Sequence, residues 1–241
     1  MTKTEFKIKY GGHFLEICCK YPYTYELCEH YLTAVNNTDK YIEAQPEEIQ
    51  KIKDFIGKRN IRDDVAESEA IHHAIADYVL DKDELIIHAA VCAVENTGFG
   101  FIAPSGTGKT THMLLWKELL KDKFRYVNGD KPLISLKNNI VYASGTPWCG
   151  KERYQSPETV RLKAMAFLRR SDENGIKKLT PYEAEKKLIN AVVLSEDMAN
   201  NIMPVVRLIN RIAKAVDFCE LSCNKEPRAA ELAYSVMRGI E

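Results

Sequence analysis

The sequence lacks any excess of charge of one sign, because Lys plus Arg and Asp plus Glu each number 34. A chain without net charge has no long-range field that would draw it to nucleic acid or to an anionic lipid surface. It also lacks any apolar run near the roughly 18 to 20 residues that a membrane-spanning helix needs, and its first residues show no secretory signal. These absences predict a cytoplasmic protein that binds neither nucleic acid nor membrane.

An even set of cysteines is missing too, since the chain has seven. An odd number without an export signal favours reduced thiols over a disulfide framework. Cys219 and Cys223 are separated by three residues, but no second Cys/His pair lies nearby to complete a zinc site. Cys219, Leu221 and Cys223 alternate as one face of a strand does. We therefore expect buried thiols.

Internal repeats and low-complexity segments are also absent, so the order of elements must indicate the architecture. The first part of the chain predicts a hairpin turned at Gly11-Gly12, a short strand and three helices. We expect the hairpin over 6–19 and the strand over 40–44. We expect the helices over 25–32, 47–56 and about 65–80, with a polar break over 58–64 before the third helix. His72 and His73 fall in the third helix, where we expect them to be solvated.

The sequence becomes richer in apolar runs after residue 82, where we expect a boundary between two parts of the chain. Leu85–Val94 is nearly all apolar, as a strand buried on both faces would be, and Gly98–Ala103 is a second such run. His88 interrupts the first run, and burying an unpaired imidazole is costly, which favours a hydrogen-bonded core histidine. Further strands are expected at 124–127, 133–136, 140–143, 162–168 and 216–221, and helices at 110–120, from 181, at 195–213 with a kink at Pro204, and at 227–237.

Glycines follow the second apolar run in the segment Ala103-Pro-Ser-Gly-Thr-Gly-Lys-Thr110. Glycine at Gly106 and Gly108 lets backbone N–H groups turn inward around phosphate oxygens, and the helix behind them adds its positive N-terminus. Lys109 can neutralise phosphates, and the Thr110 hydroxyl suits Mg²⁺. Such a pattern arises by chance in roughly 2% of chains this long. We therefore predict a phosphate-binding loop for ATP, with GTP left open, whose nucleotide contacts come from residues 105–111: Ser105, Gly106, Thr107, Gly108, Lys109, Thr110 and Thr111.

The surroundings of this loop resemble the family that unites HPr kinase/phosphorylase with ATP-dependent phosphoenolpyruvate carboxykinase. The resemblance is carried by Ile87-His-Ala-Ala90, by the loop through His112, by Val127-Asn-Gly-Asp-Lys-Pro-Leu-Ile134 and by Gly145-Thr-Pro-Trp-Cys-Gly-Lys-Glu152. The order of these segments is most similar to short bacterial HPr-kinase-like proteins. The resemblance implies an α/β fold whose mixed β-sheet carries the loop. It also implies an accessory α+β segment over residues 1–82 and a nucleotide-binding domain over residues 83–241.

The same resemblance implies Mg²⁺-dependent phosphoryl transfer from ATP to a hydroxyl. Asp130 matches the aspartate that activates the acceptor, and it also suits Mg²⁺ together with Thr110. His88 matches a functional histidine upstream of the loop, which makes Asp130, His88 and Lys109 the expected catalytic residues. Relatives carry paired aspartates at this point, whereas this chain has Gly129-Asp130-Lys131. Asp130 is therefore the base, a metal ligand or both.

The acceptor is a small metabolite, a peptide or a protein side chain. We expect Trp148, Lys151 and Arg153 to border it, with Arg169 and Arg170 as further candidates; a packing role for Trp148 is equally open. A Pro-Gly-Arg-Asn segment typical of HPr kinases is missing, and the chain is too short for a carboxykinase, so neither HPr nor oxaloacetate is the expected substrate. A nucleotide-binding regulatory protein is the alternative, and an ATPase that drives mechanical change is a weaker one. Self-association into a homo-oligomer is left open.

Overall fold

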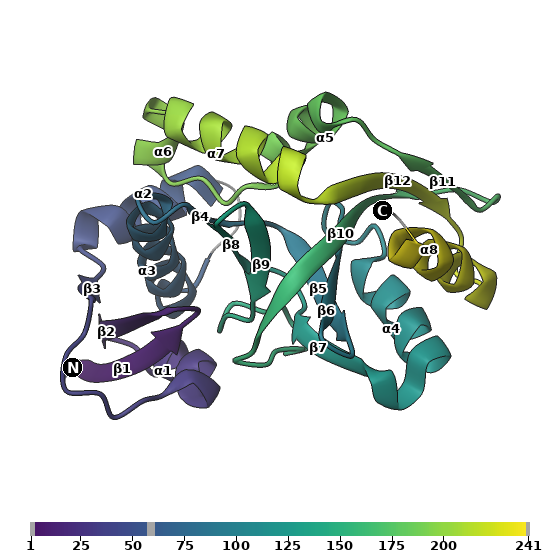
Figure 1. Ribbon diagram of the computed structural model, residues 1–241. Helices are drawn as coiled ribbons and strands as arrows, with labels where there is room; N and C mark the ends of the chain where they lie inside the picture. Colours follow the sequence, from purple (N-terminus) through teal and green to yellow (C-terminus); the bar gives the residue numbers. More distant parts are fainter. Residues whose placement is uncertain (1–2, 57–60, 240–241) are drawn as a thin grey trace.

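The computed structural model describes residues 3–56 and 61–239, which form a small and a large β-sheet (Figure 1). The small sheet has the order β1-β2-β3. Its strands β1 (Thr4–Tyr10) and β2 (His13–Cys19) form the expected antiparallel hairpin, and β3 (Lys40–Glu43) runs parallel to β2. Gly11 allows the tight turn because it takes a left-handed φ of 58°.

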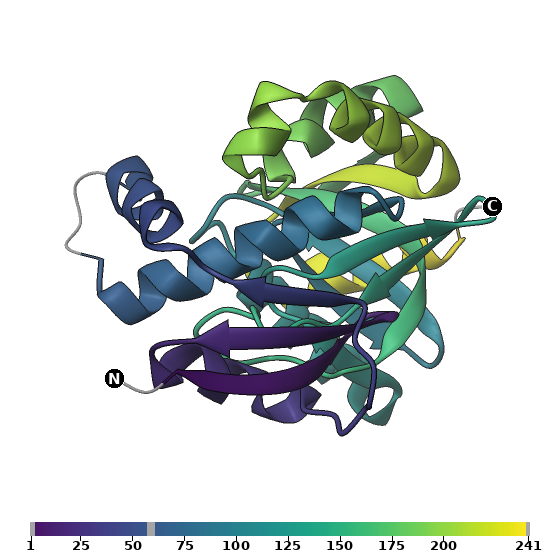
Figure 2. The same ribbon diagram turned by 90° about the vertical axis from the view of Figure 1, so that its left-hand side faces the viewer.

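Helices of the first part of the chain pack against this small sheet or, in the case of α2, against α3. They are α1 (Pro22–Cys28), the short η1 (Glu29–Tyr31), α2 (Pro46–Ile56) and α3 (Asp63–Leu80). Figure 2 shows α3 passing between the small sheet and the helices at the top of the molecule. Part of the polar break expected over 58–64 lies outside the described residues.

The large sheet has nine strands, and seven of them follow the order β4-β8-β9-β10-β6-β5-β7. The remaining two lie off this path, with β12 paired to β10 and β11 paired to β12. The strand bounds are β4 (Glu84–Ile86), β5 (Ala89–Val94), β6 (Thr97–Ile102), β7 (Phe124–Asn128), β8 (Leu133–Lys137), β9 (Ile140–Ser144), β10 (Thr159–Arg170), β11 (Gly175–Lys178) and β12 (Asp217–Cys223). Because β6, β10 and β12 are mutually parallel while the other pairings are antiparallel, the expected mixed α/β sheet is confirmed.

Helices cover both faces of the large sheet (Figure 1). The helical elements are α4 (Lys109–Leu120), η2 (Lys121–Lys123), α5 (Pro181–Leu188), η3 (Ile189–Ala191), α6 (Glu196–Asn200), α7 (Met203–Ala215) and α8 (Pro227–Gly239). In β5, Ala90 and Cys92 pack with α4 and α8, whereas Val91 and Ala93 belong to the larger core that includes α3 and α7. A strand with apolar neighbours on both faces needs apolar residues at every position, which explains the run that was read from the sequence.

Three sequence expectations about elements are wrong. The run 85–94 is not one strand, because it breaks at Ile87-His88, where His88 is exposed rather than held in the core. The helix expected over 195–213 is two helices, and Pro204 stands at the start of α7, where a proline sacrifices no needed donor. His72 is fully buried instead of solvated.

The thiols and the membrane expectation can also be compared with the structure. All seven cysteines lie within the described residues and are free; six are buried, and Cys223 is half-buried. Buried reduced thiols were expected. Within the described part of the chain, no helix is both long and apolar enough to cross a membrane.

Candidate functional site

The glycine loop, residues 103–108, joins the end of β6 to the start of α4. Gly106 and Gly108 take φ values of 77° and 126°, in the left-handed half of backbone space. A Cβ added to either glycine would meet no atom within 4 Å. Their role is therefore backbone conformation and not close packing, since other residues pay a steric penalty there.

Backbone donors gather where the loop becomes a helix. The N–H of His112 donates to the Gly108 carbonyl at 2.9 Å and is the first to make a helical bond. The N–H groups of Lys109, Thr110 and Thr111 precede it in the first turn, where an α-helix offers no carbonyl partner. Such donors, together with the helix dipole, attract an anion.

Lys109 places its ammonium over this loop. Its side chain is buried and donates from Nζ to the carbonyl of Ala103 at 2.8 Å. Burial lowers the pKa of Lys109, while the nearby carboxylate of Asp130 raises it. Within residues 3–56 and 61–239, this carbonyl is the one hydrogen-bond partner of Nζ, so the ammonium keeps two donors for an incoming oxygen.

A cleft of about 500 Å³ opens on the other side of the loop. Its walls come from the loop, from α4, from the end of β10 and from the segments that follow β10 and β12, including Thr107, Thr111, Leu168, Arg169, Asp172 and Asn224. Arg170 donates to the carbonyls of Gly106 and Thr107. This contact fixes the direction of two loop peptide groups, a role that the sequence did not reveal.

Strand register brings three separate segments to one edge of the large sheet. Ala89 at the start of β5 pairs with Ile102 at the end of β6, and its N–H donates to the Asp130 carbonyl at 2.9 Å. His88 directly precedes β5, Ala103 directly follows β6, and Asp130 lies two residues beyond the end of β7. Lys109, at the start of α4, reaches this edge through its Nζ bond to the Ala103 carbonyl. The three expected catalytic residues, Asp130, His88 and Lys109, therefore belong to one edge.

Asn128 shapes the turn that carries Asp130. Its Oδ1 accepts from the N–H groups of Asp130 at 2.9 Å and Lys131 at 2.7 Å. Its Nδ2 donates to the carbonyl and hydroxyl oxygens of Thr146 at 3.0 and 3.1 Å. Asn128 is fully buried, so these bonds leave its amide satisfied. Sequence reasoning missed both residues, although an asparagine two positions before Asp130 is typical of such turns.

The positions on either side of Asp130 differ in what they allow. A Cβ at Gly129 would lie 2.6 Å from the carbonyl oxygen of Cys149, so no side chain fits there without a shift. Lys131 fits, and its Nζ lies 3.0 and 2.9 Å from the two carboxylate oxygens of Glu69 in α3. Packing thus accounts for glycine at position 129, and the side chain at position 131 forms an ion pair with Glu69.

His88 lies exposed between β4 and β5, held by its N–H bond to the Ala191 carbonyl at 2.6 Å. Partial burial of its ring lowers its pKa; Lys131 and Lys109 lower it further, whereas Asp130 and Glu69 raise it. These charges surround the imidazole. A neutral ring in this setting can accept a proton or a hydrogen bond.

The segment 145–152 passes beside Asp130. Gly150, with φ 85°, lies so close that a Cβ there would be 3.3 Å from the Asp130 Cβ. Lys151 and Arg153 are exposed on this turn, and Arg153 has a left-handed φ of 52°. Trp148 points the other way: it is 5% exposed and stacks on His72 with ring centroids 4.4 Å apart.

The oxygen donors near the loop suit a cation that is shared with phosphates. Thr110 and Asp130 are both half-buried and offer one hydroxyl and one carboxylate. Among the described residues no group of three or more His, Cys, Asp or Glu could hold a metal ion by itself. Mg²⁺ usually needs only one or two carboxylates when substrate phosphates and water complete its shell, so this donor set fits Mg²⁺ bound with a nucleotide.

Comparison with solved structures finds similar chains. The chain is similar in structure to the HPr(Ser) kinase/phosphatase from Coxiella burnetii, with 8% sequence identity, 64% of this chain and 93% of that chain covered, and a TM-score of 0.37. No protein-family model matches the sequence. No curated protein matches it either.

Proposed function

We propose that this protein is a phosphotransferase that moves the γ-phosphoryl group of ATP to a hydroxyl with the help of Mg²⁺. One observation carries the proposal: at one edge of the large sheet His88 precedes β5, Asp130 lies just beyond β7, and Lys109 at the start of α4 donates to the carbonyl of the residue that follows β6. A phosphate-binding lysine, an imidazole and a carboxylate are the groups that phosphoryl transfer requires.

The roles follow from the chemistry of each group. Backbone N–H groups and side chains of residues 105–111 hold the phosphates, and Lys109 neutralises oxygens of the β and γ phosphates, where the bond from the γ-phosphorus to the bridging oxygen breaks. Mg²⁺, bound by Thr110 and Asp130, would draw charge from the phosphate oxygens. Asp130 takes the hydroxyl proton as the acceptor oxygen bonds to phosphorus and ADP leaves. His88 orients Asp130 or contacts the transferred group.

The cleft beside the loop suits the nucleoside. Its volume of about 500 Å³ is within the range of small-molecule sites, and it accommodates either adenine or guanine. The acceptor then approaches from the side of Asp130, where the exposed Lys151 and Arg153 lie. The buried Trp148 supports this turn from behind. We assign the nucleotide site to residues 83–241 and treat residues 1–82 as an accessory segment.

The test is acceptor-dependent release of ADP, together with nucleotide binding. Lys109→Met should weaken Mg²⁺-ATP binding at least about tenfold, because a charged hydrogen bond contributes about 1.5–3 kcal/mol. Asp130→Asn should retain nucleotide binding and lose transfer by about a hundredfold or more. Lys117→Met, an exposed change on the same helix, is the control. Failure of the intact protein to bind nucleotide would refute the proposal.

A nucleotide-binding regulatory protein is the second candidate. Only one carboxylate stands in the 129–131 turn, where the next position is a lysine paired with Glu69. A regulator would bind Mg²⁺-ATP tightly and transfer nothing to any hydroxyl acceptor, and Asp130→Asn would then alter only binding. Single-turnover experiments with radiolabelled ATP and a panel of sugars, hydroxy acids and seryl peptides separate the two.

A further inference from the structure

Helix α3 reaches from the accessory segment to the edge that carries Asp130. Trp148 donates from Nε1 to the Ser68 hydroxyl at 3.2 Å, and its ring stacks on His72. Between these contacts, Glu69 receives both of its close polar contacts from Lys131 Nζ. One face of α3 therefore binds both segments that flank Asp130.

The pair between Glu69 and Lys131 differs from ordinary surface ion pairs in its burial. The side chain of Lys131 is 13% exposed and that of Glu69 is 26% exposed. A pair in this position is screened less by water and salt than an exposed one. Removing the carboxylate would leave an ammonium in a poorly solvated place directly after Asp130 in the chain.

The balance of charge at this edge depends on that carboxylate. Lys109 and Lys131 contribute two positive charges, and Asp130 contributes one negative charge. A dication has to compete with both ammonium groups for a single carboxylate, since like charges repel through the low-dielectric protein. Glu69 adds a second negative charge, which cancels the positive charge of Lys131.

We propose that Glu69 is a positioning residue for the Mg²⁺-nucleotide site, which holds Lys131 and neutralises it beside Asp130. The inference rests on the proposed function. It assigns part of the site to the accessory segment and explains how a single carboxylate in the 129–131 turn serves Mg²⁺. Glu69 acts through Lys131 and does not touch the nucleotide.

The experiment measures binding of a fluorescent ATP analogue with Mg²⁺ and, separately, with EDTA. Glu69→Gln should weaken Mg²⁺-dependent binding about tenfold and leave binding in EDTA unchanged or tighter, since the freed cation attracts phosphate. Glu69→Asp should restore most of the loss. Asp217→Asn, which breaks the pair with Lys178 at 2.9 Å on another part of the sheet, is the matched control and should bind as the unmodified protein does.

A second variant separates charge from mere support. Lys131→Met removes the charge that Glu69 balances. Adding Glu69→Gln to that variant should therefore weaken Mg²⁺-dependent nucleotide binding less than about threefold. An unchanged tenfold loss in that background would overturn the inference, and so would Glu69→Gln binding Mg²⁺-nucleotide normally.

If Glu69→Gln alone fails to fold, as circular dichroism would show, the single variant Lys131→Met still tests the inference. Weaker Mg²⁺-dependent binding in this single variant contradicts the charge account. Absence of Mg²⁺-nucleotide binding by the intact protein would instead defeat the proposed function.

Discussion

At the scale of single residues, burial decides which histidines carry a charge. His72 is fully buried, and neither ring nitrogen has a hydrogen-bond partner in the structure. Burial lowers the pKa of His72 far below its ordinary value, and the charges of Lys131, His73 and His88 lower it further. An unpartnered polar ring in a core costs about 1–3 kcal/mol. Its stacking on Trp148 offsets part of that cost.

We predict that His72→Phe makes stability less dependent on pH. The unfolded chain protonates this histidine near its ordinary pKa of about 6.5, whereas the folded protein does not. Its contribution is therefore present above about pH 6.5 and is lost as pH falls, by up to about 1.4 kcal/mol per pH unit. Phenylalanine keeps a flat ring against Trp148 and removes the pH-dependent contribution of His72 to the unfolding free energy.

Urea unfolding at about pH 7 and about pH 5 checks the prediction. His73, His88 and His112 also have lowered pKa values and keep contributing to the pH slope in both proteins. His30→Gln, an exposed change, should leave the slope as it is. Equal slopes for His72→Phe and the unmodified protein would show that His72 titrates in the folded state.

At the scale of elements, the loop between β6 and α4 depends on a neighbouring strand. Arg170 ends β10 and donates from Nε to the Thr107 carbonyl at 3.2 Å and from Nη2 to the Gly106 carbonyl. A peptide group directs its N–H opposite to its carbonyl. Holding the Thr107 carbonyl toward Arg170 therefore turns the Gly108 N–H away from β10.

We predict that Arg170→Ala weakens nucleotide binding about fivefold, a cost of ~1 kcal/mol for a more mobile loop. The thermal unfolding temperature should change little, because the arginine is exposed. Arg161→Ala, exposed near the opposite end of the same strand, serves as the control. Titration with fluorescent ATP analogue measures the difference. Equal affinities for the two variants would remove Arg170 from the support of the loop.

Local patterns predicted some elements well because their signals are local. The hairpin at Gly11, the capping box of Thr180 and Glu183, and the strands around the glycine loop depend on neighbours in sequence. The break at Ile87-His88 was missed because it is set by long-range bonds, such as that from the His88 N–H to the Ala191 carbonyl. Periodicity does not record bonds between distant segments.

The candidate site divides in the same way. Motif chemistry predicts Lys109 from the local glycine loop, and the resemblance to the kinase family predicts Asp130. Burial of His72 and the contact of Glu69 with Lys131 could not be foreseen, since both require α3 to dock on segments more than 60 residues away. The constraint on Gly129 is likewise tertiary, because it comes from the Cys149 carbonyl.

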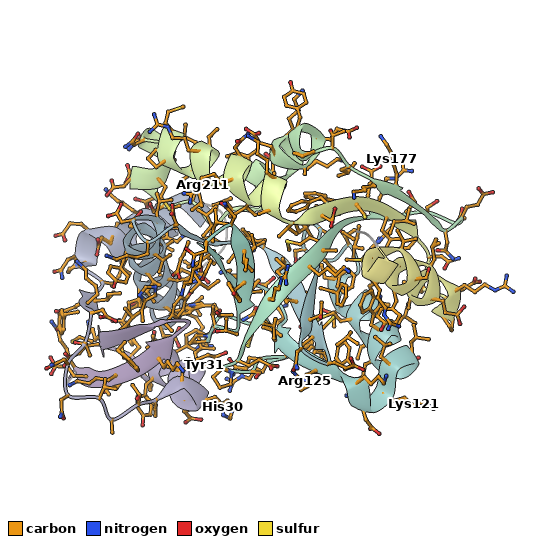
Figure 3. The ribbon with its side chains drawn as sticks, viewed as in Figure 1. His30, Tyr31, Lys121, Arg125, Lys177 and Arg211 are labelled. Carbon is orange, nitrogen blue, oxygen red and sulfur yellow. The ribbon has the colours of Figure 1, made fainter. Side chains whose placement is uncertain are left out.

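At the scale of the whole molecule, the small and large sheets share one core. Ile8 and Leu15 of the small sheet belong to the same hydrophobic cluster as Leu133 and Trp148. Polar contacts join the parts as well: Glu84, 1% exposed, lies 2.7 Å from His13 and accepts from Ser135 at 2.8 Å. Figure 3 labels Tyr31, whose hydroxyl adds to these contacts by donating to the Ser156 carbonyl at 3.4 Å. It also labels Arg211 of α7, which pairs with Asp83 at 2.5 Å within residues 83–241.

We predict that the two sheets unfold together, and the chain's two tryptophans can report it. Trp148 lies in the core shared with the small sheet, whereas Trp116 lies in the cluster formed with α4 and α8 on the other face. Because strands of the large sheet contribute side chains to both hydrophobic clusters, unfolding the cluster on one face exposes the apolar side chains on the other face to water. In Trp116→Phe and in Trp148→Phe, the fluorescence midpoint in urea should coincide with the circular dichroism midpoint of that same variant.

Glu84→Ala extends this test, because it removes a buried carboxylate from the contact between the sheets. It leaves His13 and Ser135 without their partner, so the unfolding free energy should fall by about 3 kcal/mol. Added to each single-tryptophan protein, it should lower both fluorescence midpoints to a similar extent. The surface pair of Lys3 and Glu43 offers the control, where Glu43→Gln should leave the unfolding free energy almost unchanged. A shift confined to the Trp148 signal would mean that the small sheet and α3 unfold independently, and that Glu69 could then leave Lys131 while the glycine loop remains folded.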